Sequence, residues 1–184
     1  LTLAKGALGG PPIDFTLNQC QKAVYGYRGR NAMIVNGWTI CNSIIEDMFN
    51  GKCGSYGPLT WEKEKIWLPN GMCLQYPDLK GEPGERGIDW TYRAGKGRTK
   101  LYGGLLCENL VQALARIIVG EQLLTIGKKM RVVMITHDEI VTCVRAENGA
   151  LAFKLMESAM RTAPAWCSDI PLNAEGGFAI NYSK

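Results

Sequence analysis

The chain contains a single histidine, His137, and two carboxylates, Asp138 and Glu139, follow it directly. Histidine can exchange a proton near neutral pH, and carboxylate oxygens are the ligands that hard divalent cations prefer. Adjacent carboxylates also repel each other, and a bound cation or polar substrate relieves that repulsion. The tripeptide is therefore the strongest candidate site in the sequence, and a solvated polar turn is the alternative interpretation.

Apolar residues flank this tripeptide on both sides. Val132 to Ile135 and Ile140 to Val144 are each typical of a short strand, which places the carboxylates at the tip of a β-hairpin. Neighbouring side chains in a regular strand face opposite ways. We therefore expect Asp138 and Glu139 to play unequal roles.

The elements that would position this tip follow from the spacing of apolar residues. Helical spacing predicts two helices or one broken helix within 16–48, with interruptions near Gly29 and Gly37, a long helix over 105–126 and a shorter one over about 147–162. Segment 65–76 alternates as a β-hairpin does, and Asn70-Gly71 suits its tight turn. Segment 80–98, rich in glycine and charge, predicts an exposed ribbon or loop with one short strand, and the C-terminal tail is expected to be extended.

These elements favour an α+β fold in which helices pack on a small antiparallel sheet. Strands and helices do not alternate regularly, and the chain has no glycine-rich phosphate loop, so a doubly wound nucleotide-binding fold is disfavoured. A length of 184 residues with 46% hydrophobic content suffices for one sizeable core. One domain, or most of one, is expected.

Composition also limits which cofactors, partners and cellular locations are expected for the protein. Seven scattered cysteines without a Cys-x-x-Cys pair argue against zinc and against a disulfide framework. The formal charge of +4 permits a nucleic-acid partner without requiring one. We expect no apolar stretch long enough to form a membrane helix, so the sequence predicts a cytoplasmic protein with no membrane partner. Because the chain begins at Leu1 and not at a methionine, we expect a truncated or processed product.

Five ordered patterns resemble the C-terminal part of the polymerase domain of family A DNA polymerases, and most closely the phage-type branch. In chain order they are Val24-x-x-Tyr27-Arg28-x-x-Asn31-x-x-Ile34-Val35-x-x-Trp38, Leu68-Pro-Asn-Gly71 with Tyr76-Pro77, Tyr102-Gly-Gly-x-x-x-Glu108-Asn109-x-x-Gln112-Ala-x-Ala-Arg116, His137-Asp138-Glu139, and Ile170-Pro-Leu-x-Ala-Glu175-Gly176. His137-Asp138-Glu139 is similar to the family's motif C. The resemblance implies partial fingers helices in 1–50 and a palm-like subdomain in 51–184, with a β-hairpin insertion at about 60–100.

The resemblance implies two-metal chemistry with Mg²⁺ and catalytic roles for Asp138, Glu139 and His137. Asp138 would be a metal ligand, Glu139 an outer-shell or occasional ligand, and His137 would lie beside the primer terminus. The partner aspartate belongs to a motif, Asp-x-Ser-x-x-Glu-x-Arg, that this chain does not contain. The fragment is therefore expected to be inactive alone and to need the N-terminal part of the polymerase as a partner.

The resemblance also implies primer-template DNA and deoxynucleoside triphosphates as partners. Gln112 and Asn109 would reach the minor-groove edge of the terminal base pairs, where hydrogen-bond acceptors occur in every Watson–Crick pair. Arg116 could bind a backbone phosphate, although a structural ion pair is the more common role of a helix-surface arginine. A phage or prophage origin is left open.

Two alternatives to a polymerase fragment remain. A non-catalytic DNA-binding module on the same scaffold would bind DNA in a salt-sensitive way without needing metal. A metal-dependent hydrolase built on His137, Asp138 and Glu139 is the weaker alternative, because one histidine with two adjacent acids is a thin ligand set.

Overall fold

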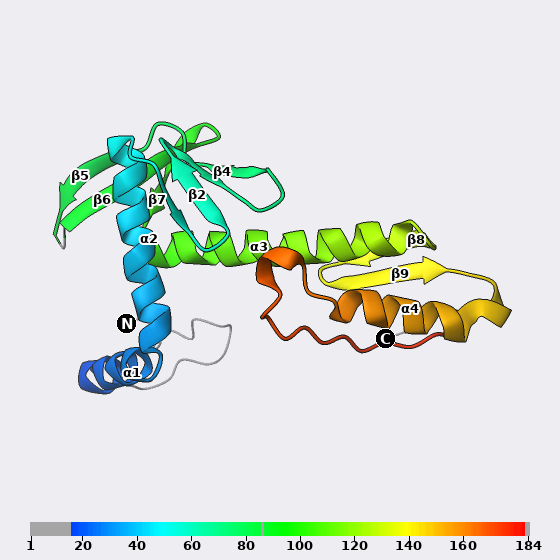
Figure 1. Cartoon of the computed structure of the whole chain (residues 1–184). Helices are drawn as coiled ribbons and strands as arrows, with labels where there is room; N and C mark the ends of the chain where they lie inside the picture. The colour runs from blue at the N-terminus through cyan, green and yellow to red at the C-terminus, as the bar shows by residue number, and fades with distance from the viewer. Residues whose placement is uncertain (1–15, 86, 183–184) are drawn as a thin grey trace.

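The computed structural model describes residues 16–85 and 87–182 and confirms an α+β fold (Figure 1). The described helices are α1 (Leu17–Arg30), α2 (Ala32–Asn50), α3 (Gly103–Gly127) and α4 (Gly149–Arg161), with 3-10 turns η2 (Ala146–Asn148) and η3 (Ala165–Cys167). The strands are β1 (Gly54–Tyr56), β2 (Leu59–Glu62), β3 (Lys65–Trp67), β4 (Cys73–Gln75), β5 (Lys80–Gly84), β6 (Gly87–Ala94), β7 (Gly97–Leu101), β8 (Arg131–Thr136) and β9 (Glu139–Cys143).

The predicted helical region is two helices, separated at Asn31. A capping box starts α1: the Thr16 hydroxyl accepts from the backbone N–H of Gln19, and the Gln19 side chain accepts from the backbone N–H of Thr16. Gly51, at φ +69°, ends α2 in the left-handed conformation that glycine adopts without strain. Gly37 lies inside α2, so the interruption expected there is wrong.

Segment 54–101 forms two antiparallel sheets. One has the order β1-β2-β3-β4, and the predicted hairpin of β3 and β4 lies within it, with Gly71 at φ +79° in the turn. The other has the order β5-β6-β7. The one short strand expected within 80–98, with Trp90 and Tyr92, is present as β6. The rest of the segment is not a loop, because β5 and β7 pair with β6, and Trp90 and Tyr92 turn one face of this sheet inward.

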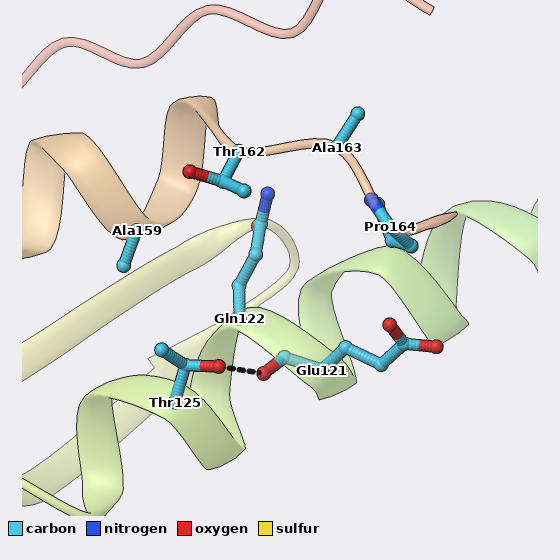
Figure 2. Close-up of a pocket in the computed structure, with 7 residues that line it drawn as sticks. All are labelled: Glu121, Gln122, Thr125, Ala159, Thr162, Ala163 and Pro164. Atoms are coloured by element: carbon cyan, nitrogen blue, oxygen red, sulfur yellow. Dashed lines mark hydrogen bonds between the residues drawn. The ribbon is translucent and has the colours of Figure 1, made fainter. Parts of the chain in front are cut away.

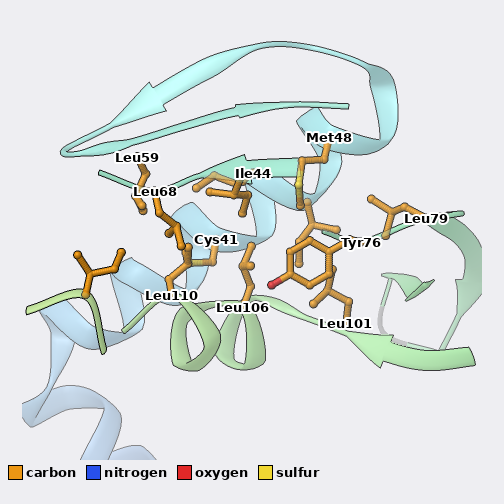
Figure 3. Packing of buried hydrophobic residues seen from close by; sticks show 13 residues of the cluster. Cys41, Ile44, Met48, Leu59, Leu68, Tyr76, Leu79, Leu101, Leu106 and Leu110 are labelled. Carbon is orange, nitrogen blue, oxygen red and sulfur yellow. The ribbon is translucent and has the colours of Figure 1, made fainter. Parts of the chain in front are cut away.

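The main hydrophobic core lies where α2, both of these sheets and the N-terminal half of α3 meet (Figure 3). Ile45, Met48, Ile66 and Leu106 are completely buried there. Burial, with a smaller contribution from the neighbouring Cys107, raises the pKa of the Cys41 thiol to about 12. Cys41 therefore stays neutral and packs as a small apolar residue.

The core crosses residue 50, because α2 supplies Cys41, Ile44, Ile45 and Met48 to it while the strands supply Leu59 and Ile66. The proposed division into fingers helices over 1–50 and a palm over 51–184 stays a prediction. Residues 1–15 of that first segment lie outside the described residues.

Helix α3 connects two lobes (Figure 1). The core lobe contains α2, β1 to β7 and the N-terminal half of α3, and the hairpin lobe contains the C-terminal half of α3, β8, β9, α4 and the tail that follows. Helix α3 is long and apolar enough to cross a membrane by length and composition, contrary to the sequence expectation. One such helix is weak evidence for a membrane span, and α3 buries Leu106, Leu110 and Ile117 in the core of this structure.

The tail after η3 is extended, as predicted, and runs back beneath α4 (Figure 1). Arg161 of α4 donates to the carbonyl oxygen of Ala174 at 3.0 Å. The rings of Phe153 and Phe178 lie 6.2 Å apart between centroids. These contacts bring the C-terminal end of the described chain toward the hairpin.

Candidate polymerase site

The hairpin tip predicted from the sequence is present. Strands β8 and β9 pair antiparallel with Thr136 opposite Glu139, so His137 and Asp138 form a two-residue turn. A register irregularity between Val132 and Met134 interrupts the pairing. Helix α3 leads directly into β8, and β8 packs against it.

The backbone at the tip is strained at His137. Its φ is +53°, a value that non-glycine residues adopt at a cost of roughly 1–2 kcal/mol. Two-residue hairpin turns require a positive φ at the first central position, and glycine or asparagine usually supplies it. The chain instead places an imidazole there.

The two carboxylates differ in their surroundings, as expected. Asp138 is exposed in the turn, whereas Glu139 is half-buried as the first residue of β9. The Tyr182 hydroxyl donates to Oε2 of Glu139 at 3.2 Å. Tyr182 was not predicted as a site residue, because 43 residues of sequence separate it from Glu139 and no local pattern marks the contact.

The described residues do not complete a metal site. Among residues 16–85 and 87–182, no group of three or more histidine, cysteine, aspartate or glutamate side chains could hold a metal ion. Mg²⁺ keeps its hydrating waters unless several carboxylates or phosphates replace them. Asp138 and Glu139 alone therefore do not fit a magnesium cage.

Helix α3 carries three of the four residues predicted to contact DNA, each in a different setting, and the fourth is His137 at the hairpin tip. The side-chain amide of Asn109 donates to the buried Tyr76 hydroxyl at 3.2 Å, so this residue is tied to the core. Gln112 is exposed and donates to Glu108 of the same helix at 3.2 Å. Arg116 is exposed, and no carboxylate of the described residues lies within ion-pair distance of it, so the structural ion pair expected as its more common role is not found.

A pocket between α3 and the C-terminal end of α4 contains none of the predicted site residues (Figure 2). Its lining includes Gln122, which is buried and donates to the carbonyl oxygen of Met160 at 2.7 Å. The adjacent Glu121 accepts from the indole N–H of Trp166 at 3.1 Å. These polar groups join α3 to the segment after β9, and sequence reasoning missed both because a polar residue on a helix usually faces solvent.

The amino-acid sequence of this chain is similar to that of a DNA polymerase. The DNA polymerase of Bacillus phage SP02 is 34% identical over 127 residues, covering 65% of this chain and 19% of that protein. The chain thus spans about a fifth of the length of this relative. No family model and no solved structure matches the chain. The similarity supports a relationship to DNA polymerases.

Proposed function

We propose that this chain is the C-terminal fingers-and-palm portion of a family A DNA polymerase of the phage-type branch. In its complete form the enzyme would transfer nucleotides from deoxynucleoside triphosphates to a primer paired with template DNA. Two findings support the proposal: the similarity to the phage SP02 polymerase, and a sequence with the family's patterns in order.

The observation that carries the proposal is the position of Asp138. It lies exposed in a strained two-residue turn between paired strands, where other parts of a polymerase can approach it. We assign Asp138 as one ligand of the catalytic Mg²⁺ ions and Glu139 as a weaker or outer ligand. His137 would donate to a phosphate or sugar oxygen at the primer terminus.

The remaining metal ligand must come from a carboxylate outside the described residues, because these residues contain no suitable group of three. The surface of β8 is consistent with such a partner. Val133, Met134 and Ile135 are 52%, 37% and 37% exposed, and β9 is the only strand paired with β8 in the described part of the chain. A further strand from the N-terminal part of the polymerase would cover these side chains and bring its aspartate to the tip.

We further assign Gln112 and Arg116 to contacts with primer-template DNA. Both are exposed on α3, and Arg116 has no carboxylate within ion-pair distance among the described residues. Asn109 is the weakest of the three assignments, because its amide already donates to Tyr76. We also propose that the polymerase is cytoplasmic and originates from a phage or prophage.

Primer extension tests the proposal. We expect template-dependent, Mg²⁺-dependent extension by the complete polymerase that contains this chain, and none by the purified 184-residue chain. Metal binding to the isolated chain should be no tighter than about the millimolar range, because Asp138 acts there without a partner aspartate.

Two outcomes would contradict this assignment. A complete polymerase that binds DNA but never extends a primer would favour the non-catalytic module. Extension by the isolated chain that disappears in Asp138→Ala would show that the chain contains its own complete metal site.

A further inference from the structure

The β5-β6-β7 sheet turns one face toward the core and the other away from it. Strand register places Thr91 directly opposite both Lys80 and Lys100, and Arg93 directly opposite Arg98. Directly opposite residues lie on the same face of a sheet, and so do residues two apart along a strand. The four cations therefore share one face, while Trp90 on the other face packs against Phe49 of α2 with ring centroids 5.0 Å apart.

Lys96 adds a fifth exposed cation in the turn between β6 and β7. We call Lys80, Arg93, Lys96, Arg98 and Lys100 the basic end of the sheet. The acidic residues Glu82 and Asp89 also lie on this face, but they stand opposite each other nearer the turn between β5 and β6.

One carboxylate, Asp78, forms ion pairs with two cations of the basic end. Asp78 accepts from Arg98 at 2.6 Å and lies 3.6 Å from the Lys80 amine. The hydrogen bond from Arg98 lowers the pKa of Asp78, so this carboxylate is ionised at neutral pH. Arg98 also donates to the hydroxyl and the carbonyl oxygen of Thr91, at 3.0 and 2.9 Å, which fixes its guanidinium against the sheet.

The other three cations are uncompensated. No carboxylate of residues 16–85 and 87–182 lies within 4.0 Å of the charged groups of Arg93, Lys96 or Lys100. Like charges directly opposite in a sheet are destabilising, and Arg93 opposite Arg98 is such a pair. Asp78 offsets the charge of Arg98, whereas the charge of Arg93 has no carboxylate beside it in the described chain, and an anionic partner would relieve the repulsion that remains.

We propose that the basic end of the sheet binds the phosphate backbone of duplex DNA. Backbone positions directly opposite each other in a sheet are about 5 Å apart, as at Arg93 and Arg98, and positions two apart along a strand are roughly 7 Å apart, as at Arg98 and Lys100. Cations held at such spacings suit the closely spaced phosphates of a duplex. Trp90 and Tyr92 point to the opposite face, so the basic face lacks the aromatic platform on which single-stranded bases stack. The proposal rests on the proposed polymerase function for the kind of partner.

This contact would be separate from the candidate catalytic tip. The sheet ends at Leu101, beside the start of α3, and the hairpin follows the end of α3 (Figure 1). A helix of 25 residues is about 37 Å long. The basic end would hold the duplex while the tip acts on the primer.

The test measures how tightly the 184-residue chain binds a fluorescein-labelled DNA duplex of about 24 base pairs. Fluorescence anisotropy reports the binding at a series of salt concentrations. The variant is Arg93→Gln with Lys100→Gln. The matched control is Lys22→Gln with Lys154→Gln, which removes two exposed cations that also have no carboxylate within 4.0 Å in the described chain. Circular dichroism checks that both variants are folded.

We expect the sheet variant to bind the duplex at least about tenfold more weakly at low salt, with a salt slope smaller by about two. The control should change affinity by less than about twofold. Equal losses in both variants would overturn the inference, because only net charge would then matter. Absence of duplex binding by the parent chain, or equally tight binding of a single strand, would also overturn it.

The proposed function is tested separately in the complete polymerase. There we expect the sheet variant to raise the Kd for primer-template without changing the rate of incorporation at saturating DNA. If Asp138→Asn loses nucleotide incorporation but binds the duplex normally, the result supports the catalytic role of the hairpin tip and does not test the basic end of the sheet. If the complete protein never extends a primer, the proposed polymerase function is contradicted. If the same protein still loses duplex affinity in the sheet variant, the proposed contact between the basic end of the sheet and DNA is supported all the same.

Discussion

The core lobe and the hairpin lobe differ in how completely the chain buries them. In the core lobe, two helices and two sheets enclose a continuous cluster that includes the fully buried Ile45, Ile66 and Leu106. In the hairpin lobe, the strand that leads to the candidate site exposes Val133, Met134 and Ile135. The lobe that stabilises the fold and the lobe that carries the candidate chemistry are therefore different parts of the molecule.

This difference indicates which lobe depends on a partner. Burial of apolar surface contributes roughly 25 cal/mol per Å², so a closed core is stable by itself, whereas an exposed apolar strand gains stability only when something covers it. If Asp138 holds a metal ion as proposed, the acidic tip depends on further ligands as well, because the described residues contain no group of three or more that could hold a metal ion.

Loss of the Asp138 charge should give the largest effect, and it tests the hairpin lobe. In the complete polymerase we expect Asp138→Asn to reduce incorporation by several kcal/mol of transition-state stabilisation, because a neutral amide is a poor ligand for Mg²⁺. Single-turnover incorporation measures this. Glu139→Gln serves as the comparison and should be milder.

A variant Asp138→Asn that keeps more than about a tenth of the parental rate, a loss below roughly 1.4 kcal/mol, would reject Asp138 as a metal ligand. If Glu139→Gln is the more damaging change, the two carboxylates exchange roles. If neither substitution matters, the candidate chemistry lies elsewhere in the molecule.

Truncation of a core residue should give the next largest effect. Leu106→Ala is expected to lower the free energy of unfolding by about 2–5 kcal/mol, because Leu106 is completely buried. Met134→Ala in the hairpin lobe should cost less than about 1 kcal/mol in the isolated chain, since its side chain is 37% exposed. Urea unfolding monitored by tryptophan fluorescence and by far-UV circular dichroism compares the two, and equal losses would contradict a difference between the lobes.

The packing of α4 against the C-terminal half of α3, within the hairpin lobe, can be tested at Gln122. Gln122 lines the pocket drawn in Figure 2. Its side-chain amide donates to the carbonyl oxygen of Met160 at 2.7 Å and joins α3 to α4. Gln122→Leu keeps a similar volume but leaves that carbonyl without this donor, so we expect a loss of about 1–3 kcal/mol. The exposed Gln112→Leu is the matched control and should change stability by less than about 0.5 kcal/mol.

The sequence predicted those elements whose signal is local. The long helix α3, the Asn70-Gly71 turn and the tip at His137 and Asp138 each follow from a pattern within a few residues, and the structure confirms them. Of the β5-β6-β7 sheet only one short strand was predicted, because five glycines in 80–97 favour loops locally, while the packing of Trp90 and Tyr92 that stabilises the sheet depends on distant partners in α2 and at Tyr76.

Features of the candidate site also divide into local ones, which the sequence can predict, and long-range ones, which it cannot. Asp138 and Glu139 were expected to be unequal because neighbouring residues of a strand face opposite ways. They do differ in burial, but for another reason: Asp138 lies in the turn and Glu139 begins β9. The hydrogen bonds from Tyr182 to Glu139 and from Asn109 to Tyr76 were missed, because they join segments 43 and 33 residues apart. The roles assigned to Asp138, Glu139, His137, Asn109, Gln112 and Arg116 stay predictions.

The smallest expected effect concerns the backbone of the tip, where stability and function should separate. His137 has φ +53°, which a β-branched residue adopts poorly and asparagine adopts readily. His137→Val should therefore lower the free energy of unfolding by about 1 kcal/mol, whereas His137→Asn should leave it unchanged within about 0.5 kcal/mol. If the imidazole acts at the primer terminus, both variants reduce incorporation by the complete polymerase. If His137 only shapes the turn, His137→Asn keeps the parental rate, and the strained residue then belongs to the fold and not to the chemistry.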